Sequence, residues 1–275
     1  MIKFRSKTAA GLALAVASIT ALAACSSSGS SSSAPSTSTV KSGGSLTFAL
    51  DEDVAGFNLL QADDAEFVLA EILDQTWPSV YIIQPNLTLK LDTNVVTSAA
   101  LTKTNPQTVV YQINPKAAWS DGVPINADDF IYNWQSQSGN PTYKDVGGKA
   151  YLPASTSGYS SIKSVTGSNN GKTVTVVFAK PFSDWKALFG AGTPIIPGHT
   201  AKKVGFNDGF QNFGAAVQVS GGPYIIQSYA KGQDLVEVPN PLPGYAQLMY
   251  RPCAKKAVAM LGRRPVCKKH AKAGR

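Results

Sequence analysis

Apolar and polar residues alternate along several short segments of the chain, and this alternation predicts strands with one buried face. The first such strand is expected at 45–50, directly after two glycines. Further strands are expected at 88–91, 95–98, 108–113, 162–165, 173–178, 224–229 and 235–238. Asn169-Asn170-Gly171 lies between two of these segments, and such a sequence favours the left-handed backbone of a tight hairpin turn.

One segment, 62–75, repeats its apolar residues with the period of a helix. These residues are Ala65, Val68, Leu69, Ile72 and Leu73. Three acidic residues, Asp63, Asp64 and Glu66, are expected in the first turn, where negative charge is favoured by the helix dipole. We interpret them as helix-terminal residues and not as catalytic acids.

A second helix is expected to begin at Ala127. Asn126 before it is a favourable N-cap, and Asp129 stands three residues after Asn126, where a capping box places its acidic partner. Strands mixed with a few helices predict an α/β (mixed α+β) fold. The chain has 275 residues, which is enough for a sizeable core without disulfides.

The first 24 residues have the pattern of an export signal. A basic start precedes an uncharged apolar run at 8–21, which is shorter than the roughly 20 residues a membrane-spanning helix needs. The run ends in Leu22-Ala23-Ala24-Cys25, which resembles the bacterial lipobox and implies that Cys25 is lipidated. The Ser-rich segment 25–44 is expected to be a flexible tether that spans roughly 20–25 Å. The alternative is an ordinary signal peptide followed by an incidental cysteine.

The net charge of +8 is unevenly distributed. All 17 acidic residues lie between Asp51 and Glu237, whereas the last 35 residues contain nine basic residues and no acidic one. In the middle of the chain acidic residues outnumber basic ones. This distribution argues against a protein that binds nucleic acid.

Residues that carry chemistry are sparse in the middle of the chain. Between positions 26 and 240 there is no cysteine and a single histidine, His199, with no carboxylate beside it in the sequence. We expect His199 in a turn or at the start of a helix. The nucleophile elbow G-x-S-x-G is absent, which disfavours a secreted hydrolase. We therefore expect no catalytic residue, no metal and no cofactor.

The segment 118–130 reads AWSDGVPINADDF. It resembles the signature W-S-D-G-x-P-x-x-A-x-D-F of the family 5 bacterial extracellular solute-binding proteins. The matching residues are Trp119, Ser120, Asp121, Gly122, Pro124, Ala127, Asp129 and Phe130. Further resemblances are Lys180-Pro181-Phe182 and the segment SGGPY at 220–224. The signature residues are interpreted as structural, because they build a turn and start a helix.

The resemblance implies that 45–240 is part of lobe I of a two-lobe, class II periplasmic-binding-protein-like fold, with the second lobe missing. It implies a non-enzymatic receptor that binds a peptide or similar small solute and works with the permease and ATPase subunits of an ABC importer. The protein would lie outside the cytoplasm, anchored to the outer face of the cell membrane by lipidated Cys25. With one lobe, binding is expected to be weak. The alternative function is a surface lipoprotein that acts as a static adhesin or scaffold.

Position relative to these motifs suggests a set of ligand contacts, in the loop after the first strand, near the turn at 77–81 and beside the glycines of 220–224. These residues are Phe57, Asn58, Trp77, Tyr81, Gly222 and Tyr224.

The composition changes abruptly at about Pro241. Segment 241–275 holds two of the three cysteines and shows no apolar period of 2 or 3.6. We expect it to be disordered or to arise from a frameshift. The alternatives are a basic extension that binds anionic lipid or wall polymer, a disulfide between Cys253 and Cys267, and a three-ligand zinc site with His270.

Overall fold

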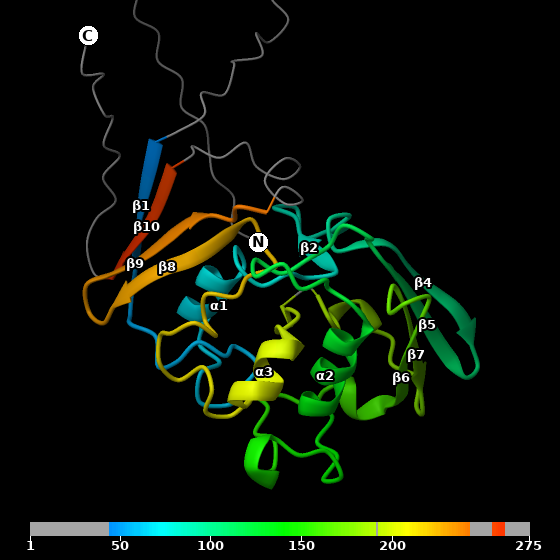
Figure 1. The fold of residues 1–275 in the computed structure, drawn as a ribbon. Helices are drawn as coiled ribbons and strands as arrows, with labels where there is room; N and C mark the ends of the chain where they lie inside the picture. The colour runs from blue at the N-terminus through cyan, green and yellow to red at the C-terminus, as the bar shows by residue number, and fades with distance from the viewer. Residues whose placement is uncertain (1–43, 191, 243–254, 262–275) are drawn as a thin grey trace, which may run out of the picture. The chain divides into compact units, whose positions relative to one another are not determined.

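The computed structural model describes residues 44–190 and 192–242 and, for the backbone alone, 255–261 (Figure 1). All of them lie in the second of two units into which the chain divides, Val40–Arg275. The predicted signal peptide, the tether, Cys25 and most of the basic tail lie outside the described residues. Within the described part, no helix combines the length and the apolar character that a membrane crossing requires.

One antiparallel sheet has the strand order β4-β5-β7-β6. Its strands are β4 (Val96–Thr104), β5 (Gln107–Ile113), β6 (Ile162–Ser168) and β7 (Thr173–Phe178). Helix α2 (Ala127–Gln137) packs against β6 and β7, and Phe130 of this helix lies beside Tyr111 of β5 in a buried aromatic cluster. Asn169, Asn170 and Gly171 between β6 and β7 have φ of 53°, 52° and 75°, which confirms the predicted left-handed hairpin turn.

A second sheet has the order β1-β10-β9-β8. It contains β1 (Gly44–Leu50), β8 (Tyr224–Ala230), β9 (Asp234–Pro239) and β10 (Lys255–Leu261). Strand β1 runs parallel to β10, and the other pairs are antiparallel. Its buried face packs with helix α1 (Phe67–Leu73) in a separate core, to which Leu50, Leu69, Ile226 and Leu235 belong.

Shorter elements connect these layers. Strands β2 (Tyr81–Ile83) and β3 (Leu89–Leu91) form a hairpin, and helix α3 (Gly198–Val204) lies beside α2 (Figure 1). Three 3₁₀ turns complete the described part: η1 (Val146–Gly148), η2 (Tyr159–Ser161) and η3 (Trp185–Ala187). The result is the predicted mixed α/β fold.

The N-terminal end of the first helix differs from its prediction. Helix α1 begins at Phe67, so no acidic residue lies in its first turn, and Asp63 and Asp64 belong to the preceding loop. The reason is that the Asp64 side chain is buried and accepts hydrogen bonds from the backbone of Asn58 and from the Gln211 amide. These tertiary contacts fix the loop in a non-helical path.

Strand β10 lies inside the segment for which no regular structure is expected. It occupies Lys255–Leu261 and pairs with both β1 and β9. Five uncharged residues, 257–261, suffice for a strand that has a neighbour on each side, and so short a run gives little periodicity to detect. The remainder of 243–275 lies outside the described residues.

Candidate functional site

The signature segment forms a buried turn that leads into α2. Asp121 accepts a hydrogen bond from the Val123 backbone N–H at 3.1 Å, and Gly122 has φ of 88°, a left-handed value that favours glycine. Ala118 and Pro124 form a bridge across the turn, and the Trp119 side chain is fully buried beneath it. These contacts hold the turn in the conformation that leads into α2.

The start of α2 is fixed by the predicted capping box. The Asn126 side chain accepts from the backbone N–H of Asp128 at 2.7 Å, and the Asp129 carboxylate accepts from the Asn126 N–H at 3.0 Å. Asp129 also accepts from Gly198 N–H at 3.0 Å and from Trp119 Nε1 at 3.3 Å. Burial raises the pKa of Asp129, while these donors oppose the shift. One carboxylate thus joins the signature turn, α2 and α3.

His199 lies at the start of α3, as expected, and contacts the signature turn from there. Its Nε2 is 2.8 Å from a carboxylate oxygen of Asp121, although the two residues are 78 positions apart. Its Nδ1 is buried without a hydrogen-bond partner among the described residues. Ser120 and Ser220 add a second long-range contact, since Ser120 N–H donates to the Ser220 carbonyl at 2.7 Å. We call Trp119, Asp121, Asp129, His199 and Ser220 the signature junction.

Phe57 and Asn58, the predicted ligand contacts after β1, are buried in this structure. The Phe57 ring packs edge-on against Tyr229, with ring centroids 5.1 Å apart. The Asn58 amide donates to the Phe206 carbonyl at 2.6 Å and accepts from the Leu60 N–H at 3.1 Å. Both side chains therefore hold the loop in place.

The other four predicted contacts lie in two places. Trp77 is buried against Phe210, and Tyr81 is buried against Trp185. Gly222 approaches the chain so closely that an added Cβ would lie 2.4 Å from the Gln75 carbonyl oxygen. Tyr224 is half-buried, and its backbone N–H donates to the same carbonyl at 3.1 Å. The structure brings Gly222 and Tyr224 together at the turn that ends in Trp77 and places Tyr81 in a different core.

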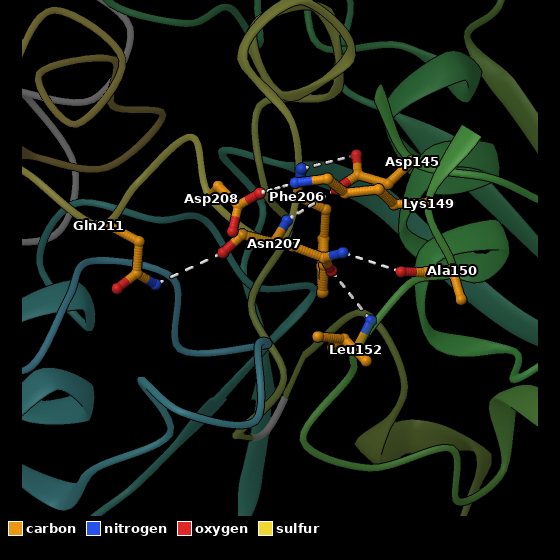
Figure 2. Close-up of polar contacts among 8 residues, drawn as sticks. All are labelled: Asp145, Lys149, Ala150, Leu152, Phe206, Asn207, Asp208 and Gln211. Carbon is orange, nitrogen blue, oxygen red and sulfur yellow. Dashed lines mark hydrogen bonds and ion pairs between the residues drawn. The ribbon is translucent and has the colours of Figure 1, made fainter. Parts of the chain in front are cut away.

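A set of polar contacts between residues far apart in the sequence holds the loop after β1 in place. Figure 2 shows eight residues of this anchoring network: Asp145, Lys149, Ala150, Leu152, Phe206, Asn207, Asp208 and Gln211. The buried Asp145 carboxylate accepts from the backbone N–H groups of Phe206 and Asn207, both at 2.8 Å.

The Asn207 side chain uses both ends of its amide in this network. Its Nδ2 donates to the Ala150 carbonyl at 2.8 Å, and its Oδ1 accepts from the Leu152 N–H at 2.9 Å (Figure 2). Gln211 reaches the Asn207 carbonyl at 3.4 Å and also Asp64 at 2.9 Å. The network therefore connects 145–152 through 206–211 to the loop after β1. No local sequence pattern identifies it, because its partners are about 60 to 150 positions apart.

Burial raises the pKa of Asp64, which accepts only from neutral amides. Among the described residues, no group of three His, Cys, Asp or Glu side chains is placed to hold a metal ion. The site as described is a rigid scaffold of hydrogen-bonded loops, suited to positioning a binding surface.

This mixed α/β arrangement is that of periplasmic solute-binding proteins. The solved periplasmic EDTA-binding protein EppA matches with a TM-score of 0.70 and 35% identity, over 80% of this chain and 40% of that one. The oligopeptide-binding protein AppA of Bacillus subtilis, solved with a nonapeptide, shares the fold with a TM-score of 0.64 at 18% identity, also over 80% and 40%. Both matches confirm that the chain covers only part of the complete fold.

The family model of the bacterial extracellular solute-binding proteins, family 5 middle region, matches residues 90–254. The chain therefore belongs to family 5 of the bacterial extracellular solute-binding proteins. The oligopeptide-binding protein OppA of Mycobacterium tuberculosis is 34% identical over 206 residues, which is 74% of this chain and 33% of that protein. The chain thus spans about a third of the length of this curated relative.

Proposed function

We propose that the protein is the substrate-binding component of an ABC importer for peptides or similar small solutes. The observation that carries this proposal is the family 5 match over 90–254, which contains all five residues of the signature junction. The 34% identity to OppA of M. tuberculosis, named as an oligopeptide-binding protein, favours peptides as the ligand class. This role requires no chemistry at the bound solute, in line with a protein that is not an enzyme.

Because the match covers 40% of each of the solved proteins EppA and AppA, we propose that the described residues form part of one lobe, so that a ligand bound to them would keep one side in water. Association has to overcome the lost freedom of both partners, and half of a binding cleft offers fewer contacts for doing so. We therefore propose that this chain binds peptides weakly. Isothermal titration of the full chain with a pool of di- to pentapeptides measures this directly. A dissociation constant in the micromolar range or tighter would contradict weak binding, while competition between peptides of different sequence would support the ligand class.

Among the predicted contacts, Tyr224 is the residue that we propose to touch the ligand. Its backbone is fixed by Gln75, and its ring is only half-buried, whereas Phe57, Asn58 and Trp77 are buried within the fold. Tyr224→Ala should weaken peptide binding at least about tenfold if the ring packs on the ligand. Tyr229→Phe, five residues further along the same strand, retains an aromatic ring and is the control. Equal affinities for Tyr224→Ala and the unchanged protein would exclude Tyr224 from the contact surface.

We propose in addition that the protein is held outside the cell membrane by lipid on Cys25. The lipobox-like sequence at 22–25 and the Ser-rich segment after it support this placement. Metabolic palmitate labelling should mark the full chain, and Cys25→Ser should abolish the label and release the protein from membranes. An unlabelled protein that is found in the cytosol would overturn the anchoring proposal, without bearing on whether the folded part binds peptide.

A further inference from the structure

The β2–β3 hairpin extends an apolar face beyond the core. Tyr81 lies opposite Leu91 and Ile83 lies opposite Leu89 in the antiparallel ladder, so all four side chains point to the same side. Tyr81 and Leu91 pack in the core of the β4–β7 sheet, but Ile83 and Leu89 are 52% and 39% exposed. Leu87 in the connecting turn is 83% exposed. We call Ile83, Leu87 and Leu89 the apolar tip.

Leu87 occupies a backbone conformation that does not suit a leucine. Its φ is 63°, in the left-handed region where glycine and asparagine are favoured and bulky side chains are rare. The turn is nevertheless well defined, because Leu87 N–H donates to the Gln84 carbonyl and Gln84 N–H donates to the Thr88 carbonyl, both at 2.8 Å. The hairpin therefore presents an exposed leucine at the one position of the turn where a small residue would be more stable.

The apolar tip is too small for a stable protein partner. Specific protein interfaces bury roughly 800 Å² on each partner, and three partly exposed side chains on a single hairpin offer much less. Insertion into the boundary between lipid headgroups and acyl chains has no such threshold, since each side chain that leaves water contributes separately.

The charges around the apolar tip are compatible with an anionic membrane. Lys90, next to Leu89 in β3, is exposed, and Lys186 Nζ lies 5.8 Å from the ring centroid of Tyr81 in β2. The single acidic residue of segment 81–113, Asp92, is buried. Basic residues next to exposed apolar ones are typical of elements that lie in the headgroup region of an anionic leaflet.

We propose that the apolar tip inserts into the outer leaflet of the membrane to which the chain is tethered. This inference rests on the proposed lipid anchor at Cys25. We expect the 18 residues between Cys25 and β1 to span roughly 20–25 Å as a coil, which keeps the folded part within reach of the bilayer. The lipid alone leaves the folded part free to rotate, whereas a second contact fixes which face it turns toward the membrane.

The test places a tryptophan at the tip of the full, lipidated chain. Leu87→Trp is reconstituted in vesicles of phosphatidylcholine and phosphatidylglycerol with brominated acyl chains, which quench tryptophan at short range. Leu152→Trp is the matched control, because Leu152 is also an exposed leucine, at 52%, but lies in another loop. The four natural tryptophans are buried, and their emission is subtracted with the unchanged protein. We expect the added signal of Leu87→Trp to be quenched at least about twofold more than that of Leu152→Trp. Equal quenching would overturn the proposal.

A second pair of variants separates insertion from folding. Leu87→Gly removes the tip side chain and suits the left-handed backbone, so its thermal midpoint should not fall. On an Ile83→Trp background, Leu87→Gly should reduce quenching by the brominated lipid, because the tip enters the bilayer less deeply. Quenching of Ile83→Trp that is unchanged by Leu87→Gly would contradict insertion at the tip.

The outcome for the anchor is read separately by palmitate labelling of the same preparations. A labelled, membrane-retained protein without quenching at position 87 refutes the apolar tip alone. A protein that carries no lipid and leaves the vesicles refutes the anchor and, with it, this proposal.

Discussion

Asp129 at the start of α2 and Glu237 in β9 are both buried carboxyl groups, but their surroundings differ. Asp129 accepts hydrogen bonds from two backbone N–H groups and from the Trp119 indole. Glu237 lies opposite Ile226 on the core-facing side of its sheet, and its Oε1 has no partner among the described residues. Burial raises the pKa of Glu237 to about 8.

The two buried carboxyl groups therefore differ in how many of their hydrogen-bonding positions are filled. At the start of α2, the buried Asp129 carboxylate is matched by donors from segments far apart in the sequence, as is usual for a buried charge in a completed core. In the β1-β10-β9-β8 sheet, the buried Glu237 carboxyl has an oxygen that receives no hydrogen bond from the described residues. Leu46 and Phe48 of β1 lie on the side of the sheet that carries Glu237, and both are half exposed. The first region should therefore lose stability when its carboxylate is removed, and the second should gain it.

The largest loss of stability is expected at Asp129. Asp129→Ala leaves the N–H groups of Asn126 and Gly198 without their acceptor, and it breaks the capping box of α2. We expect a loss of about 2–4 kcal/mol in the free energy of unfolding, measured by urea denaturation. Asp128→Ala, which removes the adjacent exposed carboxylate, is the control and should cost only a few tenths of a kcal/mol. Similar losses for the two variants would contradict a special role of Asp129.

Glu237 should show the opposite sign and a dependence on pH. Because the folded state holds this proton more tightly than the unfolded state, ionisation of Glu237 opposes folding as pH rises from about 4.5 to about 8. Glu237→Gln cannot ionise, so its advantage should grow by up to about 1.4 kcal/mol for each pH unit in this window and stop growing above it.

Thermal midpoints of Glu237→Gln and of the unchanged protein, measured from pH 4.5 to 9, test this sign. Glu71→Gln, which replaces an exposed carboxyl on α1, is the matched control for removing one carboxyl. A variant that is less stable than the unchanged protein at pH 8 would mean that Glu237 has a partner in solution.

The same contrast explains what the sequence alone could predict. The capping box of α2 was predictable because its two partners, Asn126 and Asp129, are three residues apart. The turn at 169–171 was predictable because the residues that adopt its left-handed backbone are consecutive in the sequence. The pattern of strands and helices gave the α/β class, and the resemblance of the signature turn added the periplasmic-binding-protein-like architecture.

The loop after β1 could not be predicted in the same way. From its neighbours in the sequence, Asp64 resembles an acidic residue at a helix start. In the structure its carboxylate accepts a hydrogen bond from the Gln211 amide, 147 positions away. Asn58 was expected to face a ligand and is instead bonded to Phe206, 148 positions away. His199 had no acidic neighbour in the sequence, and its partner Asp121 is found only through the packing of α3 on the signature turn. Long-range polar contacts leave no periodic pattern.

Within the anchoring network, Asn207 should matter more than the charges around it. Asn207→Ala leaves the Ala150 carbonyl and the Leu152 N–H without their partner in a buried setting. We expect a loss of about 1–3 kcal/mol in the free energy of unfolding. Amide hydrogen exchange should also quicken in 145–152 and in the loop at 57–64 more than in β5. Uniformly faster exchange throughout the described part would indicate global destabilisation without a specific link between the loops.

The smallest effect is expected for Lys149, although its ion pair is the shortest charged contact of the network. Lys149 Nζ lies 2.7 Å from Asp208, and both side chains are mostly exposed. In water the attraction is screened, and ordering two flexible side chains offsets most of it. The thermal midpoint of Lys149→Ala should therefore stay within error of the unchanged protein at both low and high salt. A clear fall that disappears at high salt would show that this pair, and not the buried amide of Asn207, holds segment 145–152 against 206–211.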